Sequence, residues 1–195
     1  MSNPFSRGKV LSIVILVIIV LFIGWGISAY NSMVRANAGV ETQWSQVENQ
    51  YQRRFDLVPN LVASVQATLS QEQEVFTAIA DARTRYAGAQ TIDDKVNAAQ
   101  SFDSALARLL VVIENYPQLK SIDAVQSFNA QLEGTENRVA TERNRYNEAV
   151  QSYNVTVQTF PRSMFARLFG FAPHAYFKAV DDAQTAPKVE FNTTR

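Results

Sequence analysis

The sequence carries few side chains that could catalyse a reaction or bind a metal ion. His174 is the single histidine, it follows Pro173 in what we expect to be an exposed loop, and there is no cysteine. These counts exclude a multi-histidine metal site, a thiol nucleophile and a disulfide framework. The Glu-x-x-His spacing of di-iron bundles and a glycine-rich phosphate loop are both missing from the sequence. We therefore expect no catalytic residue, no metal and no cofactor.

The carboxylates are better explained by helix capping and solvation than by acid–base chemistry. Asp93-Asp94 follows Thr91 at the spacing of a capping box, and Asp181-Asp182 lies in a polar tail. An enzyme needs a tuned acid–base pair with matching geometry, and these residues do not supply one. We expect the protein not to be an enzyme.

Two polar segments are candidates for either a structural lock or a surface that binds a partner protein. One occupies residues 53–60 at an expected turn, and the other ends an expected helix at Glu114. An arginine of the first segment could pair with Glu114, and the asparagines could cap exposed carbonyl groups. The alternative is a polar surface for another protein. The candidate residues are Arg53, Arg54, Asp56, Asn60, Glu114 and Asn115.

Asparagines also flank the apolar seam of the longest expected helix. The pairs Tyr146-Asn147 and Tyr153-Asn154 repeat at seven residues, so both tyrosines share one face and both asparagines share its neighbour. Asn137 and Arg138 flank the same seam. We expect these residues to give specificity to helix packing. The alternative is a bundle cavity that binds a small ligand through the tyrosines and asparagines.

An uncharged stretch at residues 10–29 precedes these polar segments. Its twenty residues, at about 1.5 Å rise each, span the hydrocarbon core of a bilayer. Trp25 and Tyr30 lie toward its end, where amphipathic rings favour the headgroup boundary. We expect an uncleaved transmembrane anchor. The alternative is a cleaved signal peptide, whose small-x-small cleavage site Ile27 and Ala29 match poorly.

The charge distribution predicts an orientation and excludes one class of partner. Lysine plus arginine and aspartate plus glutamate each number 18, so there is no basic excess for nucleic acid. Arg7, Lys9 and the terminal amine precede the uncharged stretch, whereas Arg35 follows it together with Glu41 and Glu48. By the positive-inside rule, we expect a single-pass protein of the bacterial cytoplasmic (inner) membrane with its remaining chain on the outer (periplasmic) face.

Beyond the anchor, the sequence predicts an all-α fold. Apolar residues recur at steps of three and four, and glycine and proline separate long helical patterns. The first helix continues from the anchor, and the second accepts a proline in its first turn. The expected boundaries are a first helix that ends near Arg54, a second from Asp56 through Pro59 to about Gly88, a third from Thr91 to before Pro117, and a fourth from Asp123 to Phe160.

These helices predict an antiparallel up-and-down four-helix bundle after the transmembrane helix. The fourth helix sustains a heptad-like apolar seam for about five repeats, as in a left-handed bundle or coiled coil. The expected organisation is an N-terminal tail at residues 1–9, a transmembrane helix at 10–29, the bundle with an aromatic C-terminal cap at 30–180, and a flexible tail at 181–195.

Aromatic residues with basic neighbours gather at residues 160–177. If the fourth helix runs back toward the membrane, this stretch lies at the membrane interface beside the end of the anchor. The alternative is that its aromatic side chains close the open end of the bundle. If Pro59 only kinks a single long helix, three passes would place this stretch at the far end instead. The candidate interface residues are Trp25, Tyr30, Phe165, Phe169 and Phe171.

Short motifs, none of them specific alone, occur in order along the chain. They are Tyr30-Asn31, Trp44-Ser45-Gln46, RRFDLVPNLV at 53–62, ENYPQLK at 114–120, TENR at 135–138, RYN at 145–147, Tyr153-Asn154, Phe160-Pro161, FGF at 169–171 and PKVEF at 187–191. Together they resemble the LemA family of bacterial membrane proteins over nearly the whole chain beyond the anchor. The resemblance implies an N-terminal anchor, an up-and-down four-helix bundle and no established catalytic activity. The chain departs from the family pattern at residues 121–123, where an Ala-Asn-rich turn is more usual.

Together, these features predict a membrane-anchored interaction or scaffold protein of the bacterial envelope with an unknown envelope protein partner. Self-association through the heptad seam is a further option, although a closed bundle uses that seam internally. Two alternatives stay open: a small-ligand-binding or sensor module in the bundle core, and a membrane-remodelling protein that uses the aromatic C-terminal cluster.

Overall fold

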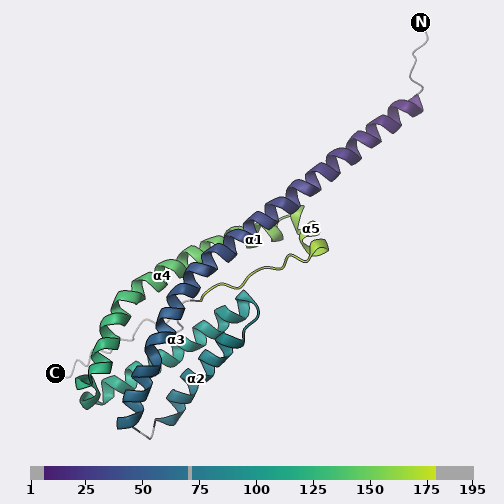
Figure 1. Ribbon diagram of the computed structural model, residues 1–195. Coiled ribbons are helices and arrows are strands. Elements are labelled where there is room, and N and C mark those ends of the chain that lie inside the picture. Colours follow the sequence, from purple (N-terminus) through teal and green to yellow (C-terminus); the bar gives the residue numbers. More distant parts are fainter. Residues whose placement is uncertain (1–6, 70–71, 179–195) are drawn as a thin grey trace, which may run out of the picture. The chain divides into compact units, whose positions relative to one another are not determined.

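The computed structural model describes residues 7–69 and 72–178, and these are mostly helical with no strand among them (Figure 1). The all-α prediction is confirmed. The expected flexible tail at 181–195 and most of the tail at 1–9 lie outside the described residues. The elements are α1 (Arg7–Thr68), α2 (Gln73–Gly88), α3 (Ile92–Asn115), the 3-10 helix η1 (Pro117–Ser121), α4 (Asp123–Gln158) and α5 (Arg162–Phe169).

The chain divides into two compact units. The first unit comprises Met1–Trp44 and Glu148–His174, and the second comprises Ser45–Asn147 and Ala175–Arg195. Helices α1 and α4 each contribute one end to the first unit and the other end to the second.

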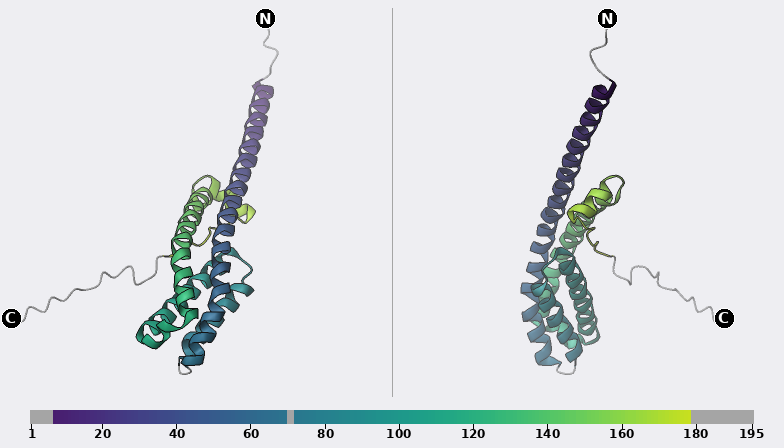
Figure 2. Two further views of the ribbon diagram at one scale, coloured as in Figure 1. Left: turned by 60° about the vertical axis from the view of Figure 1, so that its left-hand side comes forward. Right: turned by 90° about the vertical axis from the view of Figure 1, so that its right-hand side faces the viewer.

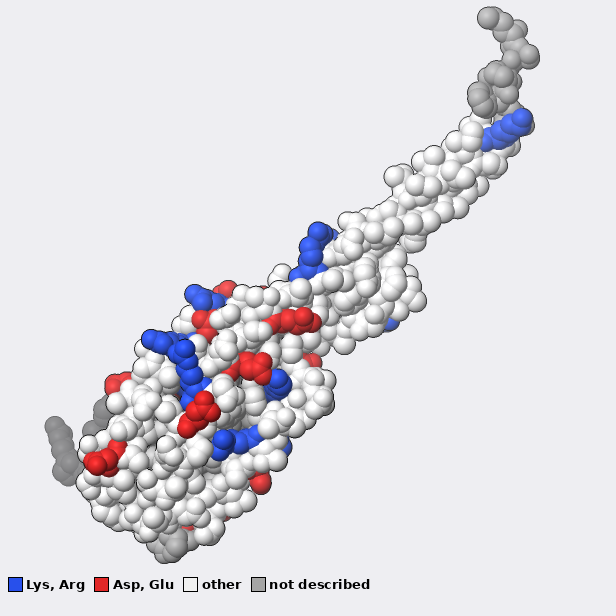
Figure 3. Space-filling view, in the orientation of Figure 1, with Lys and Arg blue, Asp and Glu red and all other residues white. Residues whose placement is uncertain are grey.

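In the first unit, the start of α1 presents a largely exposed apolar surface. The most apolar window of α1 has a mean hydropathy of 3.1 and is 0% buried, and Leu16 is 63% exposed. This part of the helix is white in Figure 3, in agreement with the uncharged sequence at residues 10–34. α3 also has the length and composition of a span, but 44% of its window is buried, as expected for a core helix.

The second unit contains four helical segments that alternate in direction. Glu48 and Arg54 of α1 pair with Lys95 and Asp103 of α3, so these two helices run parallel. The short connection after Gly88 makes α2 antiparallel to α3, and both views of Figure 2 show these two helices side by side. Within this unit, the up-and-down prediction is confirmed.

The predicted boundary between the first two helices is wrong. α1 does not end near Arg54 but continues through Pro59 to Thr68, and α2 begins only at Gln73. Proline removes one backbone donor from a helix interior, at a cost of about 3 kcal/mol. The buried residues Phe55, Val58 and Leu61 continue the same apolar face across this position. Their burial offsets the cost, so the helix continues past Pro59 to Thr68.

The later helix boundaries follow the sequence closely. Thr91 caps α3, because its Oγ1 accepts a hydrogen bond of 3.1 Å from the Asp94 backbone N–H. α3 ends before Pro117, and α4 begins at Asp123. α4 ends at Gln158, however, and Phe160 is 76% exposed rather than part of the seam.

Candidate functional site

The extended segment at residues 171–178 has no strand beside it, and side chains take the place of one. In the first unit, the Tyr153 hydroxyl donates to the Ala172 carbonyl at 2.9 Å. The Asn154 amide donates to the His174 carbonyl at 2.9 Å and accepts from the His174 N–H at 2.8 Å. Asn154 is buried, with 6% of its surface exposed. Its amide therefore satisfies both backbone groups of one residue.

The second unit repeats this arrangement. The Tyr146 hydroxyl donates to the Ala175 carbonyl at 3.1 Å, and the Asn147 amide exchanges bonds of 3.0 and 2.9 Å with the backbone of Phe177. Asp93 accepts from the Ala175 N–H at 2.8 Å, so its carboxylate holds this segment rather than capping α3. Burial raises the pKa of the Tyr146 hydroxyl, and the Asp93 charge raises it further.

The seven-residue repeat has a geometric reason. Seven residues of α-helix rise about 10.5 Å, and three residues of extended chain cover about 10 Å. Partners seven apart on α4 therefore face residues three apart on the segment, as Asn147 with Phe177 and Asn154 with His174 do. Both asparagines bind backbone groups of the extended segment, and their role in helix packing stays a prediction. The amide groups of these two asparagines bind the chain itself, and a ligand site at the tyrosines and asparagines stays a prediction.

His174 is not the exposed loop residue that we expected. It lies outside regular structure, but it is only half-exposed, and its Nε2 is 2.9 Å from Asn37 Oδ1 of α1. Its ring lies 4.9 Å from the ring of Tyr153. His174 therefore bridges α1 and α4 within the first unit.

A buried ionic network joins three helices of the second unit. Arg54 of α1 is 3% exposed and pairs with Asp103 of α3 at 3.2 Å and with Glu136 of α4. Arg143 of α4 pairs with the other oxygen of Asp103. Two arginines thus face two carboxylates, of which Asp103 is largely buried and Glu136 is 61% exposed.

Tyr51 and Phe177 extend this network with aromatic contacts. The Tyr51 hydroxyl donates to Asp103 at 2.7 Å and accepts from Arg143. The Arg143 guanidinium lies 4.9 Å from the centre of the Phe177 ring and 5.4 Å from that of Tyr51. Burial raises the pKa of Tyr51, partly opposed by the positive charge of Arg143. Phe177 is therefore a core residue of the second unit rather than a membrane or end-cap residue.

The remaining polar candidates lie on the surface of the second unit. Arg54 pairs with Asp103 and not with Glu114, because Glu114 lies eleven residues, or about 16 Å, farther along α3. Residues 53–60 lie inside α1 and not at a turn, so they cap no helix end. The exposed candidates are Arg53, Asp56, Asn60, Glu114, Asn115, Asn137 and Arg138.

The interface candidates come together in the first unit. The Phe165 ring of α5 lies 5.2 Å from that of Trp25 and 6.0 Å from that of Phe22. The rings of Phe169 and Phe171 lie 5.1 and 5.6 Å from that of Tyr30. The aromatic stretch therefore lies beside the end of the uncharged segment. A role at a membrane stays a prediction.

One open cleft of about 640 Å³ lies in the second unit, between α1, α2 and the start of α3. Its walls include Glu48, Lys95, Arg83 and Tyr86, and Glu48 pairs with Lys95 at 2.5 Å. The Tyr86 hydroxyl is buried and has no hydrogen-bond partner among the described residues. Burial raises the pKa of this hydroxyl, and the Glu48 carboxylate raises it further. The described residues contain no cluster of three or more side chains suited to hold a metal ion.

Comparison with known proteins identifies the family of this chain. The match to the LemA family covers residues 43–191, which is most of the chain. The chain belongs to the LemA family. Among its relatives are magnetosome proteins MamQ 1 and MamQ 2 of Paramagnetospirillum magneticum (strain ATCC 700264 / AMB-1), each 27% identical over 89% of this chain and 74% of the relative. MamQ of Magnetospirillum gryphiswaldense (strain DSM 6361 / JCM 21280 / NBRC 15271 / MSR-1) is 27% identical over 82% and 68%.

Four residues of the ionic network, all within the LemA match, were not predicted from the sequence: Asp103, Arg143, Glu136 and Tyr51. Asp103 follows Val96 and Ala99 on the buried stripe of α3, and Arg143 lies between Val139 and Tyr146 on that of α4. Charged residues at stripe positions of two helices, with opposite signs, are a signal for a buried ion pair. Glu136 and Tyr51 carried no such signal, since one is exposed and the other reads as an ordinary core residue.

Proposed function

We propose that this LemA-family chain is a single-pass protein of the bacterial inner membrane and that its helical part is an interaction scaffold without catalytic activity. The observation that carries the proposal is the continuity of α1. An exposed, uncharged stretch long enough to cross a bilayer continues without a break to Thr68 in the second unit. A helix satisfies its own backbone groups, so such a segment is stable in hydrocarbon.

The use of polar side chains in the second unit supports a scaffold. Arg54 and Arg143 both bind Asp103, so these charges stabilise the bundle. Arg53, Asp56 and Asn60 lie three and seven residues apart on an exposed face of α1. This face is our candidate surface for an envelope protein partner.

Membrane orientation is tested by labelling single cysteines with a membrane-impermeant maleimide in intact cells whose outer membrane is permeabilised. The chain has no native cysteine, so Gln118→Cys on η1 and Ser2→Cys are matched reporters on either side of the uncharged stretch. We expect labelling at position 118 and protection at position 2 until lysis. The reverse pattern would place the bundle in the cytoplasm. A mature chain shorter than 21.8 kDa by the N-terminal stretch would identify a cleaved signal peptide.

The partner surface is tested by photo-crosslinking in cells. A photoreactive phenylalanine replaces Asn60 in one strain and Gln90, an exposed residue before α3, in a control strain. We expect a discrete adduct heavier than the 21.8 kDa chain at position 60 only. Equal adducts at both positions, or none at position 60, would contradict a specific partner on this face.

The cleft beside Tyr86 favours one second candidate, a small-ligand module. A ligand with a hydrogen-bond acceptor would satisfy the Tyr86 hydroxyl, which has no partner among the described residues. A thermal-shift screen of metabolites with carboxylate or amide groups, with Tyr86→Phe as the control, tests this idea. A stabilising metabolite that acts equally on both chains would bind elsewhere.

A further inference from the structure

Helix α5 presents two apolar sides in the first unit. One side packs on α1, where Phe165 lies over Gly26 so closely that a Cβ there would be 3.4 Å from the ring. The other side carries Met164 and Leu168, which are four residues apart and therefore neighbours on one face. They are 64% and 75% exposed, and Phe160 just before the helix is 76% exposed.

The contacts of α5 fix its level along α1. Phe22 lies seven residues before the end of the uncharged stretch, which is about 10 Å along the helix. Half the hydrocarbon thickness of a bilayer is roughly 15 Å. If residues 10–29 cross the membrane, α5 lies beside the final turns of the span, at a depth inside one leaflet.

The surface between α5 and α1 is also apolar. A groove of about 490 Å³ lies between the two helices, with walls that include Ile23, Ile27 and Phe169. In water such a groove and the exposed face of α5 would be unfavourable, whereas acyl chains would cover both. The groove adjoins the exposed apolar surface of α1, since Phe22 and Ile23 belong to both. The same acyl chains should therefore cover the groove and this surface.

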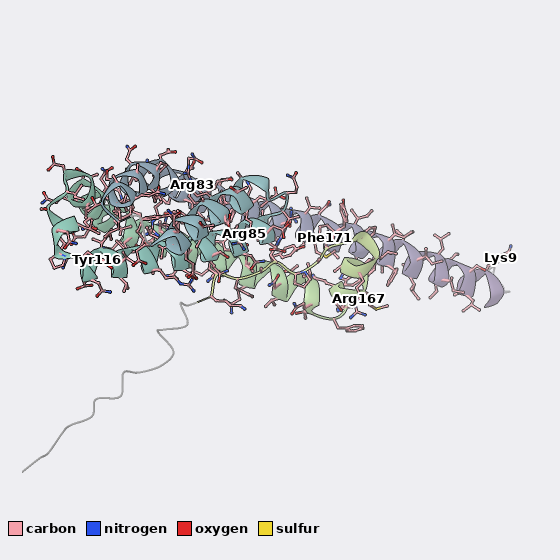
Figure 4. The ribbon with its side chains drawn as sticks, turned by 90° about the horizontal axis from the view of Figure 1, so that it is seen from below. Lys9, Arg83, Arg85, Tyr116, Arg167 and Phe171 are labelled. Atoms are coloured by element: carbon pink, nitrogen blue, oxygen red, sulfur yellow. The ribbon has the colours of Figure 1, made fainter. Side chains whose placement is uncertain are left out.

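Basic side chains accompany this apolar surface. Arg162 and Arg167 of α5 are both exposed, and Figure 4 shows Arg167 directed away from α1 while Phe171 lies on the α1 side. Long arginine side chains can reach from an interfacial helix to lipid phosphates. A short amphipathic helix with an apolar face and arginines is typical of interfacial insertion.

We infer that α5 is a second membrane element, which inserts Met164, Leu168 and Phe160 among the acyl chains of the leaflet that α1 leaves. The inference rests on the proposed span. It makes the lipid bilayer itself the occupant of the exposed apolar face of α5 and of the adjoining groove. The protein therefore contacts the leaflet at two places, through the end of the α1 span and through the α5 helix packed on it.

The test uses single cysteines in the full chain, labelled with the environment-sensitive dye NBD and reconstituted in phosphatidylcholine–phosphatidylglycerol vesicles. Leu168→Cys and Met164→Cys report on α5, and Leu16→Cys reports on the span. Gln151→Cys is the matched exposed control, expected to lie outside the bilayer. It is three residues from Asn154, which binds His174. His174 in turn contacts Asn37, eight residues after the end of the span. The readouts are the emission maximum and quenching by brominated acyl chains.

We expect blue-shifted emission at positions 168 and 164, with quenching at least twofold stronger than at position 151. Water-like emission at both α5 positions, with strong quenching at position 16, would overturn the α5 inference and leave the span intact. Weak quenching at position 16 would overturn both the span and the inference. An Arg162→Gln, Arg167→Gln variant should remove any increase in quenching at position 168 caused by phosphatidylglycerol. An increase that persists in this variant would show that these arginines do not bind the lipid phosphates.

Discussion

Asn147 and Asn154 use a property that few side chains share. A carboxamide donates and accepts at once, so it can bind both the N–H and the carbonyl of one residue, as a neighbouring strand would. Aspartate lacks the donor, and glutamine adds a methylene that shifts the amide. Without these two amides, backbone groups of His174 and Phe177 would lose hydrogen bonds, because the described part of the chain contains no neighbouring strand to replace them.

Replacement of either asparagine should therefore release the extended segment. We expect Asn147→Ala and Asn154→Ala each to lower the free energy of unfolding by about 1–3 kcal/mol, because two backbone groups lose their partners. Urea unfolding of the full chain in detergent measures this, and hydrogen exchange at His174 and Phe177 should quicken. Asn144→Ala, at an exposed position of the same helix, is the control and should change little. Equal effects at all three positions would mean that the amide pairing is not what stabilises the segment.

The buried hydroxyls of Tyr146 and Tyr86 differ in their hydrogen bonding. Tyr146 donates to the Ala175 carbonyl, whereas Tyr86 has no hydrogen-bond partner among the described residues. Tyr146→Phe should cost about 1 kcal/mol, because the Ala175 carbonyl loses its donor. Tyr86→Phe should be neutral or stabilising at pH 7, since no hydrogen bond among the described residues is lost. Urea unfolding distinguishes these outcomes, and a large loss for Tyr86→Phe would reveal a partner.

Burial of three tyrosines also predicts a loss of stability at high pH. The pKa values of Tyr51, Tyr86 and Tyr146 are raised above the usual 10.0. The unfolded chain therefore releases these protons first, and the free energy of unfolding falls as pH rises above about 10. Urea unfolding between pH 8 and 11 should show this fall, and Tyr86→Phe should make it shallower.

At the scale of the elements, Arg54 connects α1, α3 and α4. Removal of one partner from a buried charge pair leaves the other charge uncompensated, and we expect Arg54→Gln to cost about 3 kcal/mol. Arg53→Gln, one residue away but exposed, should stay within about 0.5 kcal/mol. Thermal unfolding followed by circular dichroism compares the two. Similar losses for both variants would show that Arg54 gains nothing from its buried position.

Helix α1 contains Pro59 at an exposed position, where the proline weakens the helix without forming a turn. Pro59→Ala restores the missing backbone donor and should stabilise the protein by about 1–3 kcal/mol. Asn60→Ala is the neighbouring control, and thermal unfolding measures both. A loss of stability in Pro59→Ala would mean that the proline itself is needed for packing.

At the scale of the whole molecule, the uncharged stretch should decide where the protein resides. Leu16→Asp with Ile19→Asp places two charges near the centre of the stretch, at about 2.5–3.5 kcal/mol each for membrane insertion. We expect this variant to leave the carbonate-resistant membrane fraction. The control, Val111→Asp with Gln118→Asp at exposed positions of α3 and η1, should stay in it. Retention of both variants would contradict a span at residues 10–29.

Features that depend on residues close together in the chain agree with the sequence-based predictions. The Thr91 cap, the start of α4 at Asp123 and the uncharged stretch were all readable, because each rests on residues a few positions apart. The turn predicted near Pro59 failed for the opposite reason. A local penalty at one proline was outweighed by apolar packing that only the folded second unit provides.

The sequence by itself therefore determined the helical class, most helix boundaries, the candidate span and the family. Only the tertiary structure decided the partners of the polar residues. Arg54 could have paired with several carboxylates, and the register of α1 against α3 selects Asp103. His174 and Asn37 are 137 residues apart, yet they meet in the first unit. Such contacts depend on how distant segments pack against one another, which the spacing of residues along a single helix does not encode.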